Sequence, residues 1–153
     1  MKKARINTPL GVSEIYGDEN GLQKISILDD ETEISVRIPE ELTNVVSQLD
    51  LYFKGRLKQF DLKLNPQGTA FQKKVWQELS KIPYGTTTSY LQLSKKLGDV
   101  KAIRAVAAAN GKNPLWVVIP CHRVIGSDGS LTGYAGGLHR KKWLLNLENP
   151  PIQ

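Results

Sequence analysis

The chain contains a single cysteine, Cys121, within the sequence Ile119-Pro120-Cys121-His122-Arg123-Val124-Ile125. A thiolate is a strong nucleophile, and a neighbouring histidine and arginine are groups that can lower the pKa of a thiol. The pattern therefore predicts a reactive cysteine. The alternative is a buried, inert cysteine that packs as a small hydrophobic side chain. Against that alternative, Cys121 lies at the end of an apolar, strand-like run, Leu115 to Ile119, and directly after a proline.

A glycine-rich segment, residues 126–137, follows the cysteine and contains five glycines and one aromatic residue, Tyr134. Glycine allows close approach of the backbone to a ligand and positive φ angles, and an aromatic ring can stack on a flat ligand. We expect this segment to form the wall of a pocket beside Cys121. An ordinary surface loop is the alternative.

The positive charge of the chain is confined to its second half. The net charge of the 153 residues is +6, yet residues 1–85 hold 12 Lys and Arg against 12 Asp and Glu, whereas residues 86–153 hold nine against three. A basic surface around a reactive centre favours a polyanionic partner, of which nucleic acid is the commonest. A basic face that serves only solubility is the alternative.

Several classes of protein are disfavoured by composition. No apolar stretch approaches the length that spans a membrane, and Met1-Lys2-Lys3 is not followed by the apolar core of a signal peptide. One cysteine cannot form an internal disulfide, and the two histidines provide no zinc-ligand cluster. We therefore expect a cytoplasmic protein with no metal site and no contact with a membrane.

The first part of the chain predicts a small α+β subdomain, residues 1–65. Two runs with alternating apolar residues, 6–16 and 22–28, flank the turn-rich segment 17–21 and predict a hairpin. The alternation in Ile34–Ile38 predicts a third short strand, which Pro39 would end. Apolar residues at helical spacing predict a helix over 40–53, and residues 58–68 are interpreted as a connector.

The remaining residues, 66–153, predict a mainly α-helical domain, so that the fold class as a whole is α+β. Thr69-Ala70-Phe71-Gln72 and Ser89-Tyr90-Leu91-Gln92 have the form of capping boxes. The second opens a helix that should close at Gly98, and after a short turn residues 101–110 should form another helix. Two short helices joined by a glycine-containing turn are typical of a helix-turn-helix, although any helical hairpin can show this pattern.

The second helix of this pair has an unusual composition for a DNA-reading helix. Apart from Lys101 and Arg104 its outer face is mostly alanine, whereas a helix that reads base edges in the major groove needs several long polar side chains. Small residues permit close backbone approach, and a single arginine could enter a groove or the base stack. The helix is better suited to binding DNA by shape than by sequence.

Together these residues resemble a known family, the 6-O-alkylguanine-DNA alkyltransferases, also called methylated-DNA–protein-cysteine methyltransferases. The resemblance rests on the Ile-Pro-Cys-His-Arg-Val-Ile sequence at 119–125, on Asn110–Pro114 before it, and on 132–138 and 143–148 after it. It extends over Thr69 to Glu148, just over half of the chain. The first 65 residues resemble the family's more variable N-terminal subdomain in general arrangement only.

The resemblance implies a role for individual residues. Cys121 would accept the alkyl group, His122 would act on the thiol through a bound water, and Glu148 would orient His122. The resemblance also implies that Asn113 is a hinge residue and that Tyr90 assists the leaving guanine. Tyr134 and the backbone of Val124, Ala135 and Gly136 would form the base pocket. Arg104 would act as an arginine finger, and the other implied DNA contacts are Ala105, Ala108, Arg123, Ser89 and Lys101. Many members carry serine where this chain has Ala135, but a backbone N–H would supply that contact.

The implied function is the repair of DNA by direct damage reversal. A single-use protein would flip 6-O-alkylguanine, with 4-O-alkylthymine as a second candidate substrate, out of double-stranded DNA without sequence preference and retain the alkyl group on Cys121. It would act as a monomer and need no cofactor, because nucleophile and acceptor are the same atom. Two rivals remain: a Cys-His-Glu thiol hydrolase, which would turn over repeatedly, and a non-enzymatic DNA-binding lesion sensor, although the sensor relatives lack the cysteine.

Overall fold

The computed structural model describes residues 1–30, 32–131, 133–134 and 136–150. The chain divides into two compact units, the first formed by residues 1–67 with 114–116 and the second by residues 68–113 with the chain from Val117 onward. The predicted α+β class is confirmed, because a three-stranded antiparallel sheet comes first and most helices follow it. The division expected from the sequence, between residues 65 and 66, does not place Pro114–Trp116 in the first unit, where the structure has them.

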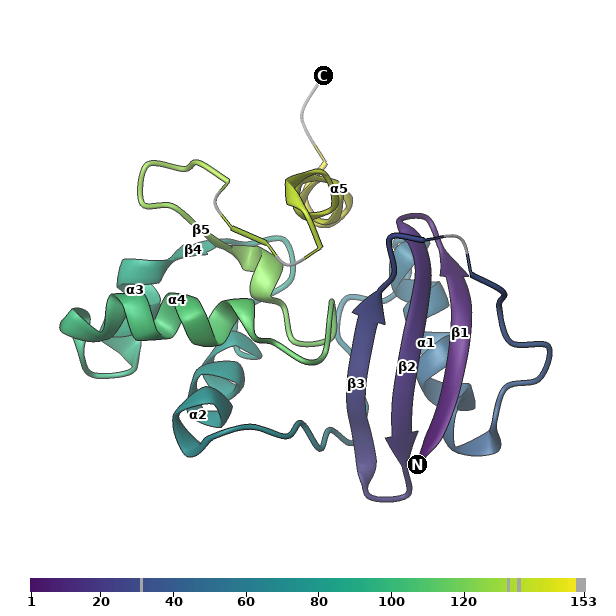
Figure 1. Cartoon of the computed structure of the whole chain (residues 1–153). Helices are drawn as coiled ribbons and strands as arrows, with labels where there is room; N and C mark the ends of the chain where they lie inside the picture. The colour runs from purple at the N-terminus through teal and green to yellow at the C-terminus, as the bar shows by residue number, and fades with distance from the viewer. Residues whose placement is uncertain (31, 132, 135, 151–153) are drawn as a thin grey trace. The chain divides into compact units, whose positions relative to one another are not determined.

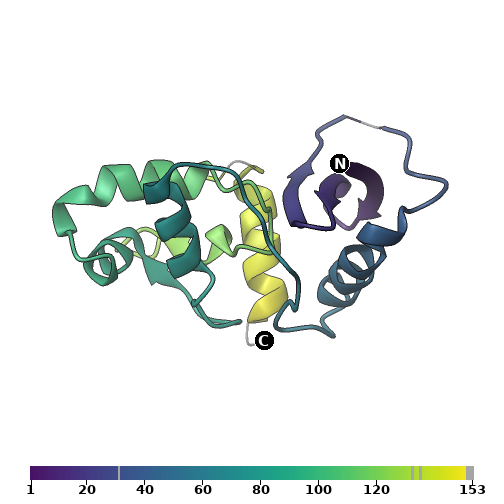
Figure 2. The same ribbon diagram turned by 90° about the horizontal axis from the view of Figure 1, so that it is seen from below.

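The first unit consists of a meander of strands β1 (Lys2–Thr8), β2 (Gly11–Asp18) and β3 (Gly21–Ile27), with helix α1 (Thr43–Phe53) along one face of the sheet (Figures 1 and 2). Burial alternates along β2, as expected for a strand with one face against a core. The predicted hairpin is present as β2 and β3, but the run 6–16 predicted as its first arm is divided by a turn at Pro9 and Leu10 into the end of β1 and most of β2. The predicted helix at 40–53 is present as a 3-10 turn, Glu40–Leu42, followed by α1.

The predicted strand at Ile34–Ile38 is not formed. Ser35 alone is tied to the sheet edge, where its backbone N–H donates to the Arg5 carbonyl at 2.9 Å and its Oγ accepts from the Arg5 N–H at 2.8 Å. Ile34 is 46% exposed and Val36 is fully exposed. The alternation in this segment therefore has no core to face, and no ladder of backbone hydrogen bonds develops.

The predicted extended run Leu115–Ile119 is also not a strand. Leu115 alone pairs with β3: the Ile25 N–H donates to the Pro114 carbonyl at 2.9 Å, and the Trp116 N–H donates to the Ile25 carbonyl at 3.2 Å. The chain then turns at Val117, whose φ of 72° is an unfavourable conformation for a β-branched residue. The approach to Cys121 is therefore a turn that follows a single bridge.

The second unit is built from helices α2 (Ala70–Leu79), α3 (Tyr90–Lys96), α4 (Ile103–Gly111) and α5 (Leu138–Glu148), with a short parallel pair, β4 (Thr88–Ser89) and β5 (Val124–Ile125). The predicted helix-turn-helix is α3 and α4. The turn passes through Gly98 at a φ of +88°, and the Asp99 side chain then caps the 3-10 turn Val100–Ala102.

Helix α2 supports α4 from inside the second unit. The buried indole of Trp76 donates from Nε1 to the Ala109 carbonyl at 2.9 Å. The N-terminus of α2 is fixed by the predicted capping box, in which Thr69 Oγ1 accepts from the Gln72 N–H at 3.1 Å and Gln72 Oε1 accepts from the Thr69 N–H at 2.9 Å. A local sequence signal thus orients the helix on which α4 packs.

Removal of the Thr69 cap should lower stability without affecting the site chemistry. Thr69→Ala leaves the first-turn N–H of Gln72 without its side-chain partner, so we expect the free energy of unfolding to fall by about 1 kcal/mol. Urea denaturation followed by circular dichroism measures this change. Thr69→Ser retains the hydroxyl and is the matched control; equal stability of the Ala and Ser variants would contradict a role for the cap.

Candidate active site

Cys121 opens a 3-10 turn, Cys121–Arg123, that follows Pro120. Its N–H donates to the Ile119 carbonyl at 2.8 Å, and the Arg123 N–H donates to the Pro120 carbonyl at 3.0 Å. Cys121 is 6% exposed, and His122 is fully buried. The turn places three consecutive functional side chains in the interior of the second unit.

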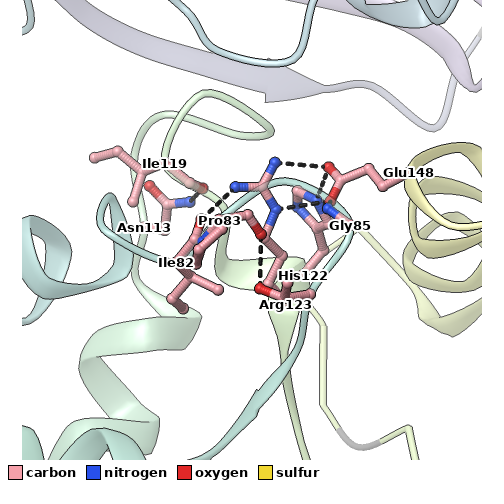
Figure 3. Close-up of polar contacts among 9 residues, drawn as sticks. Ile82, Pro83, Gly85, Asn113, Ile119, His122, Arg123 and Glu148 are labelled. Atoms are coloured by element: carbon pink, nitrogen blue, oxygen red, sulfur yellow. Dashed lines mark hydrogen bonds and ion pairs between the residues drawn. The ribbon is translucent and has the colours of Figure 1, made fainter.

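His122 is held by a carboxylate from the far end of the chain. Its Nε2 lies 2.7 Å from Oε2 of Glu148, the last residue of α5 (Figure 3). A carboxylate accepts hydrogen bonds, so Nε2 carries the proton and Nδ1 is the acceptor of the neutral ring. Nδ1 is buried and has no hydrogen-bond partner among the described residues. The structure thus brings together His122 and Glu148, as the sequence predicted, and orients the basic nitrogen away from the carboxylate.

Arg123 does not lie on a DNA-binding surface, contrary to the sequence-based assignment. It is 7% exposed, its Nε and Nη2 donate to the two oxygens of Glu148 at 2.7 and 2.9 Å, and its Nη1 donates to the Ile82 carbonyl at 2.7 Å. All three donor nitrogens of the guanidinium are therefore occupied inside the protein. A phosphate contact by Arg123 would require this buried ion pair to break.

The environment of the Cys121 thiol also differs from the expectation of a thiol acidified by His122 and Arg123. Burial raises the pKa of Cys121, and this effect is opposed, in order of size, by a hydrogen bond from Asn113, the charge of Lys141, a backbone hydrogen bond and a hydrogen bond from Tyr134. Burial prevails, so the resting side chain is a thiol. Its activation therefore requires a base that removes the proton.

Lys141 is a site residue that the sequence analysis missed. It is fully buried, and its Nζ donates to the Val124 carbonyl at 2.6 Å. Burial lowers the pKa of Lys141, and the nearby Cys121 opposes that shift. The signal available in the sequence is the helical spacing of Lys141, Leu144 and Glu148, which share the buried face of α5.

Asn113 joins the end of α4 to the turn that carries the cysteine. Its N–H donates to the Asn110 carbonyl at 3.3 Å, and its Nδ2 donates to the Ile119 carbonyl at 2.7 Å. Tyr90 reaches the same region by another route, because β4 pairs in parallel with β5 and places Ser89 opposite Ile125, immediately before Tyr90. Two elements of the helix-turn-helix are thereby connected to the segment around Cys121.

The predicted base pocket is only partly described. Tyr134 is half-buried, Val124 is buried, and the Gly136 carbonyl accepts from Nη1 of the buried Arg140 at 2.9 Å. Ala135 lies outside the described residues. The Val124 carbonyl already accepts from Lys141, but a carbonyl oxygen has a second lone pair that a ligand can use.

Four of the predicted DNA-contact residues are exposed. Arg104, Ala105 and Ala108 lie on α4, whose Val106 and Ala109 are buried, and Lys101 lies in the 3-10 turn Val100–Ala102 just before it. Ser89 is half-buried, and its Oγ accepts from the Gln92 N–H at 3.1 Å as the N-cap of α3. Of the six predicted DNA contacts, the four on α4 and the turn before it are therefore the exposed ones.

Among the residues that the structure describes, no helix has both the length and the apolar character needed to cross a bilayer. Nor do any three of their His, Cys, Asp and Glu side chains come together in a way that could hold a metal ion.

Comparison with known proteins defines the class to which this fold and site belong. The family model for the DNA-binding domain of 6-O-methylguanine DNA methyltransferase matches residues 70–150, and the model for the ribonuclease-like domain of the same proteins matches residues 1–66. The chain belongs to the 6-O-methylguanine DNA methyltransferase family, which confirms the resemblance inferred from the residues around Cys121.

Relatives match along nearly the whole chain. A methylated-DNA–protein-cysteine methyltransferase of Methanosarcina acetivorans is 45% identical over 97% of this chain and 98% of its own length. The crystal structure of the Mycobacterium tuberculosis O6-methylguanine methyltransferase is 40% identical, with a TM-score of 0.85 over 97% of this chain and 93% of that one. The M. tuberculosis OGT in complex with DNA is 42% identical, with a TM-score of 0.85 over 94% and 90%.

Burial of His122 makes stability depend on pH. Burial is the largest cause that lowers the pKa of His122 below 6.5, and the hydrogen bond and charge of Glu148 oppose it. Below pH 6.5 the unfolded chain therefore binds a proton that the folded chain does not, and stability is lost as pH falls. We expect the free energy of unfolding to fall between pH 7.5 and 5.5 by up to about 1.4 kcal/mol per pH unit from this residue.

Urea denaturation at pH 7.5, 6.5 and 5.5 measures the loss. His122→Gln keeps a donor for Glu148 but does not titrate, so it should flatten the dependence, whereas His139→Gln, at an exposed position of α5, should keep it. If the His122→Gln and wild-type proteins lose stability equally, the neutral state assigned to His122 is wrong.

Proposed function

We propose that this protein repairs DNA by transferring a methyl or larger alkyl group from O6 of guanine to Cys121 in one irreversible step. The proposal agrees with the family to which the chain belongs and with the names of its relatives, which are methylated-DNA–protein-cysteine methyltransferases. Double-stranded DNA that contains alkylated guanine is the substrate, and the protein acts on it as a monomer and without sequence preference.

One observation carries the proposal: a buried thiol and a buried imidazole lie in one turn, and the imidazole is held by a carboxylate. Glu148 accepts a hydrogen bond from the Nε2–H of His122, which leaves Nδ1 as an acceptor in the interior of the unit. A buried acceptor needs a partner, and a water between Nδ1 and the thiol would satisfy it. His122 then removes the thiol proton through that water, as the family resemblance implies.

The transfer balances with groups of this chain. The Cys121 thiolate attacks the alkyl carbon; the new S–C bond forms as the C–O bond to guanine breaks, and the bonding electrons stay on the base. The leaving guanine takes up a proton, for which the Tyr90 hydroxyl is the proposed hydrogen-bond donor. The products are an unmodified guanine and a thioether, which water does not hydrolyse, so each molecule acts once.

The alkylated base must leave the duplex to reach a buried thiol. Flipping costs a few kcal/mol, less for a poorly paired damaged base. The exposed face of α4, with small Ala105 and Ala108 beside Arg104, fits closely against a groove by shape. Arg104 is proposed to fill the space that the flipped base leaves in the stack.

Stoichiometry tests the proposed function. One equivalent of methylguanine duplex should add the mass of one methyl group to the protein, on the peptide that carries Cys121, as measured by intact-protein and peptide mass spectrometry. Cys121→Ala should abolish transfer and leave duplex binding largely unchanged. Repaired guanine in several-fold excess over protein would instead indicate a hydrolase, and duplex binding by the wild type without any transfer would indicate a lesion sensor.

The role of Arg104 can be separated from the chemistry by a comparison of two substrates. Arg104→Ala should slow repair of duplex DNA on the order of tenfold or more, because the vacated stack is no longer filled, a loss of about 1.4 kcal/mol or more of transition-state stabilisation. Its reaction with free alkylguanine should be nearly unchanged. Ala108→Ser, on the same exposed face, is the control for a small local change. Equal slowing on both substrates would remove the finger assignment.

A further inference from the structure

The Glu148 carboxylate accepts hydrogen bonds from two separate segments, the turn that carries the cysteine and the turn after α2. Oε2 accepts from His122 Nε2 at 2.7 Å and from Arg123 Nη2 at 2.9 Å, while Oε1 accepts from Arg123 Nε at 2.7 Å and, more weakly, from the Gly85 N–H at 3.4 Å (Figure 3). The side chains of His122, Arg123 and Glu148 are 0%, 8% and 2% exposed. With two of its donors on one planar guanidinium, the carboxylate has a fixed position and orientation.

The guanidinium of Arg123 is itself fixed from a third side. Nη1 donates to the carbonyl of Ile82, just beyond α2, at 2.7 Å, and the ring of Tyr84 lies 5.7 Å from the guanidinium carbon in a cation–π arrangement. Gly85 completes this turn at a φ of +79°, where an added Cβ would lie 3.1 Å from the backbone oxygen of Glu148. The turn after α2 therefore contacts both partners of the Arg123–Glu148 ion pair and helps to hold them in place.

The charge of Glu148 determines whether His122 can act as a base. An uncompensated carboxylate at 2.7 Å in a buried site would stabilise the imidazolium form, and an imidazolium has N–H groups at both nitrogens and no acceptor. A carboxylate whose charge is offset by a bidentate guanidinium attracts a proton to the ring much less strongly. It still orients the ring through Nε2.

Within the described part of the chain, the charged and titratable groups around His122 come from three segments. Glu148 and Lys141 approach from α5, and Cys121 and Arg123 flank it in the turn, while Tyr84 faces Arg123 from the segment after α2. Burial is the largest cause that lowers the pKa of His122; Glu148 raises it, and the charges of Arg123 and Lys141 lower it further. The Glu148 carboxylate favours the charged form of His122, and Arg123 is hydrogen-bonded directly to that carboxylate.

We propose that Arg123 is a positioning residue for the transfer, which fixes Glu148 and offsets its charge so that His122 stays neutral with Nδ1 ready to accept the Cys121 proton. This inference rests on the proposed function for its catalytic meaning. It replaces the DNA contact that the resemblance implied for Arg123 with a role that acts on the thiol through Glu148 and His122.

The first test observes His122 directly in the full chain. The protein contains only two histidines, so 15N-labelled imidazole signals can be assigned with His122→Gln and followed by NMR across pH 5 to 8, with the exposed His139 as internal reference. Wild-type His122 should stay neutral with the proton on Nε2 at pH 7. Arg123→Gln should move the formation of imidazolium to higher pH, and adding Glu148→Gln should reverse that move.

Arg123→Lys is the conservative variant and guards against simple unfolding. It keeps a positive charge but loses the bidentate geometry, so both the His122 titration and the transfer rate should lie between those of wild type and Arg123→Gln. In single-turnover reactions with saturating methylguanine duplex at pH 7, Arg123→Gln should be slower by a factor on the order of 10 to 100. The acidic limb of its pH–rate profile should shift to higher pH, and duplex affinity should be unchanged.

The outcomes are separable. Folded variants, Arg123→Lys included, whose His122 titrates as in wild type would overturn the proposal, as would a double variant in which the shift persists. Weaker duplex binding with an unchanged His122 titration would restore the DNA-contact assignment. Absence of methyl transfer in the wild type would overturn the proposed function, while the NMR titration would still report whether Arg123 controls the charge of His122.

Discussion

The second unit depends on one buried carboxylate. Glu148 closes α5, and its oxygens are bonded to His122 and Arg123 in the cysteine turn and to Gly85 in the turn after α2. A buried charge is tolerated only when it is paired and hydrogen-bonded, so these three segments must come together in one geometry. The same requirement that organises the fold also orients the imidazole beside the thiol.

A consequence is that the two residues following the cysteine are both directed to Glu148. His122 and Arg123 therefore do not stabilise a resting thiolate, and burial keeps Cys121 protonated. A protonated, buried thiol reacts slowly with small electrophiles, because the thiolate is the reactive form. Under the proposed function the protein uses its one cysteine once, and this resting state would protect the nucleophile until a base and a substrate are both in place.

Helix α4 and the turn that carries the cysteine are connected by three constraints. Asn113 binds the Ile119 carbonyl, the parallel pair β4–β5 sets Tyr90 next to the segment after the cysteine, and Val117 turns the chain at a φ of 72°. The exposed alanine face of α4 and the buried site therefore hold a defined relation within the second unit.

The sequence by itself determined the features that depend on local chemistry. The capping box at Thr69, the N-cap at Ser89 and the glycine turn at Gly98 were predictable because the partners lie within three or four residues, and the family followed from the residues around Cys121. Only the tertiary structure decided that Arg123 and Lys141 are buried and that the apolar runs at 34–38 and 115–119 do not form strands. An alternating pattern becomes a strand only where a sheet edge and a core are available, and a cation is buried only where distant acceptors satisfy it, such as the Glu148 carboxylate for Arg123 and the Val124 carbonyl for Lys141.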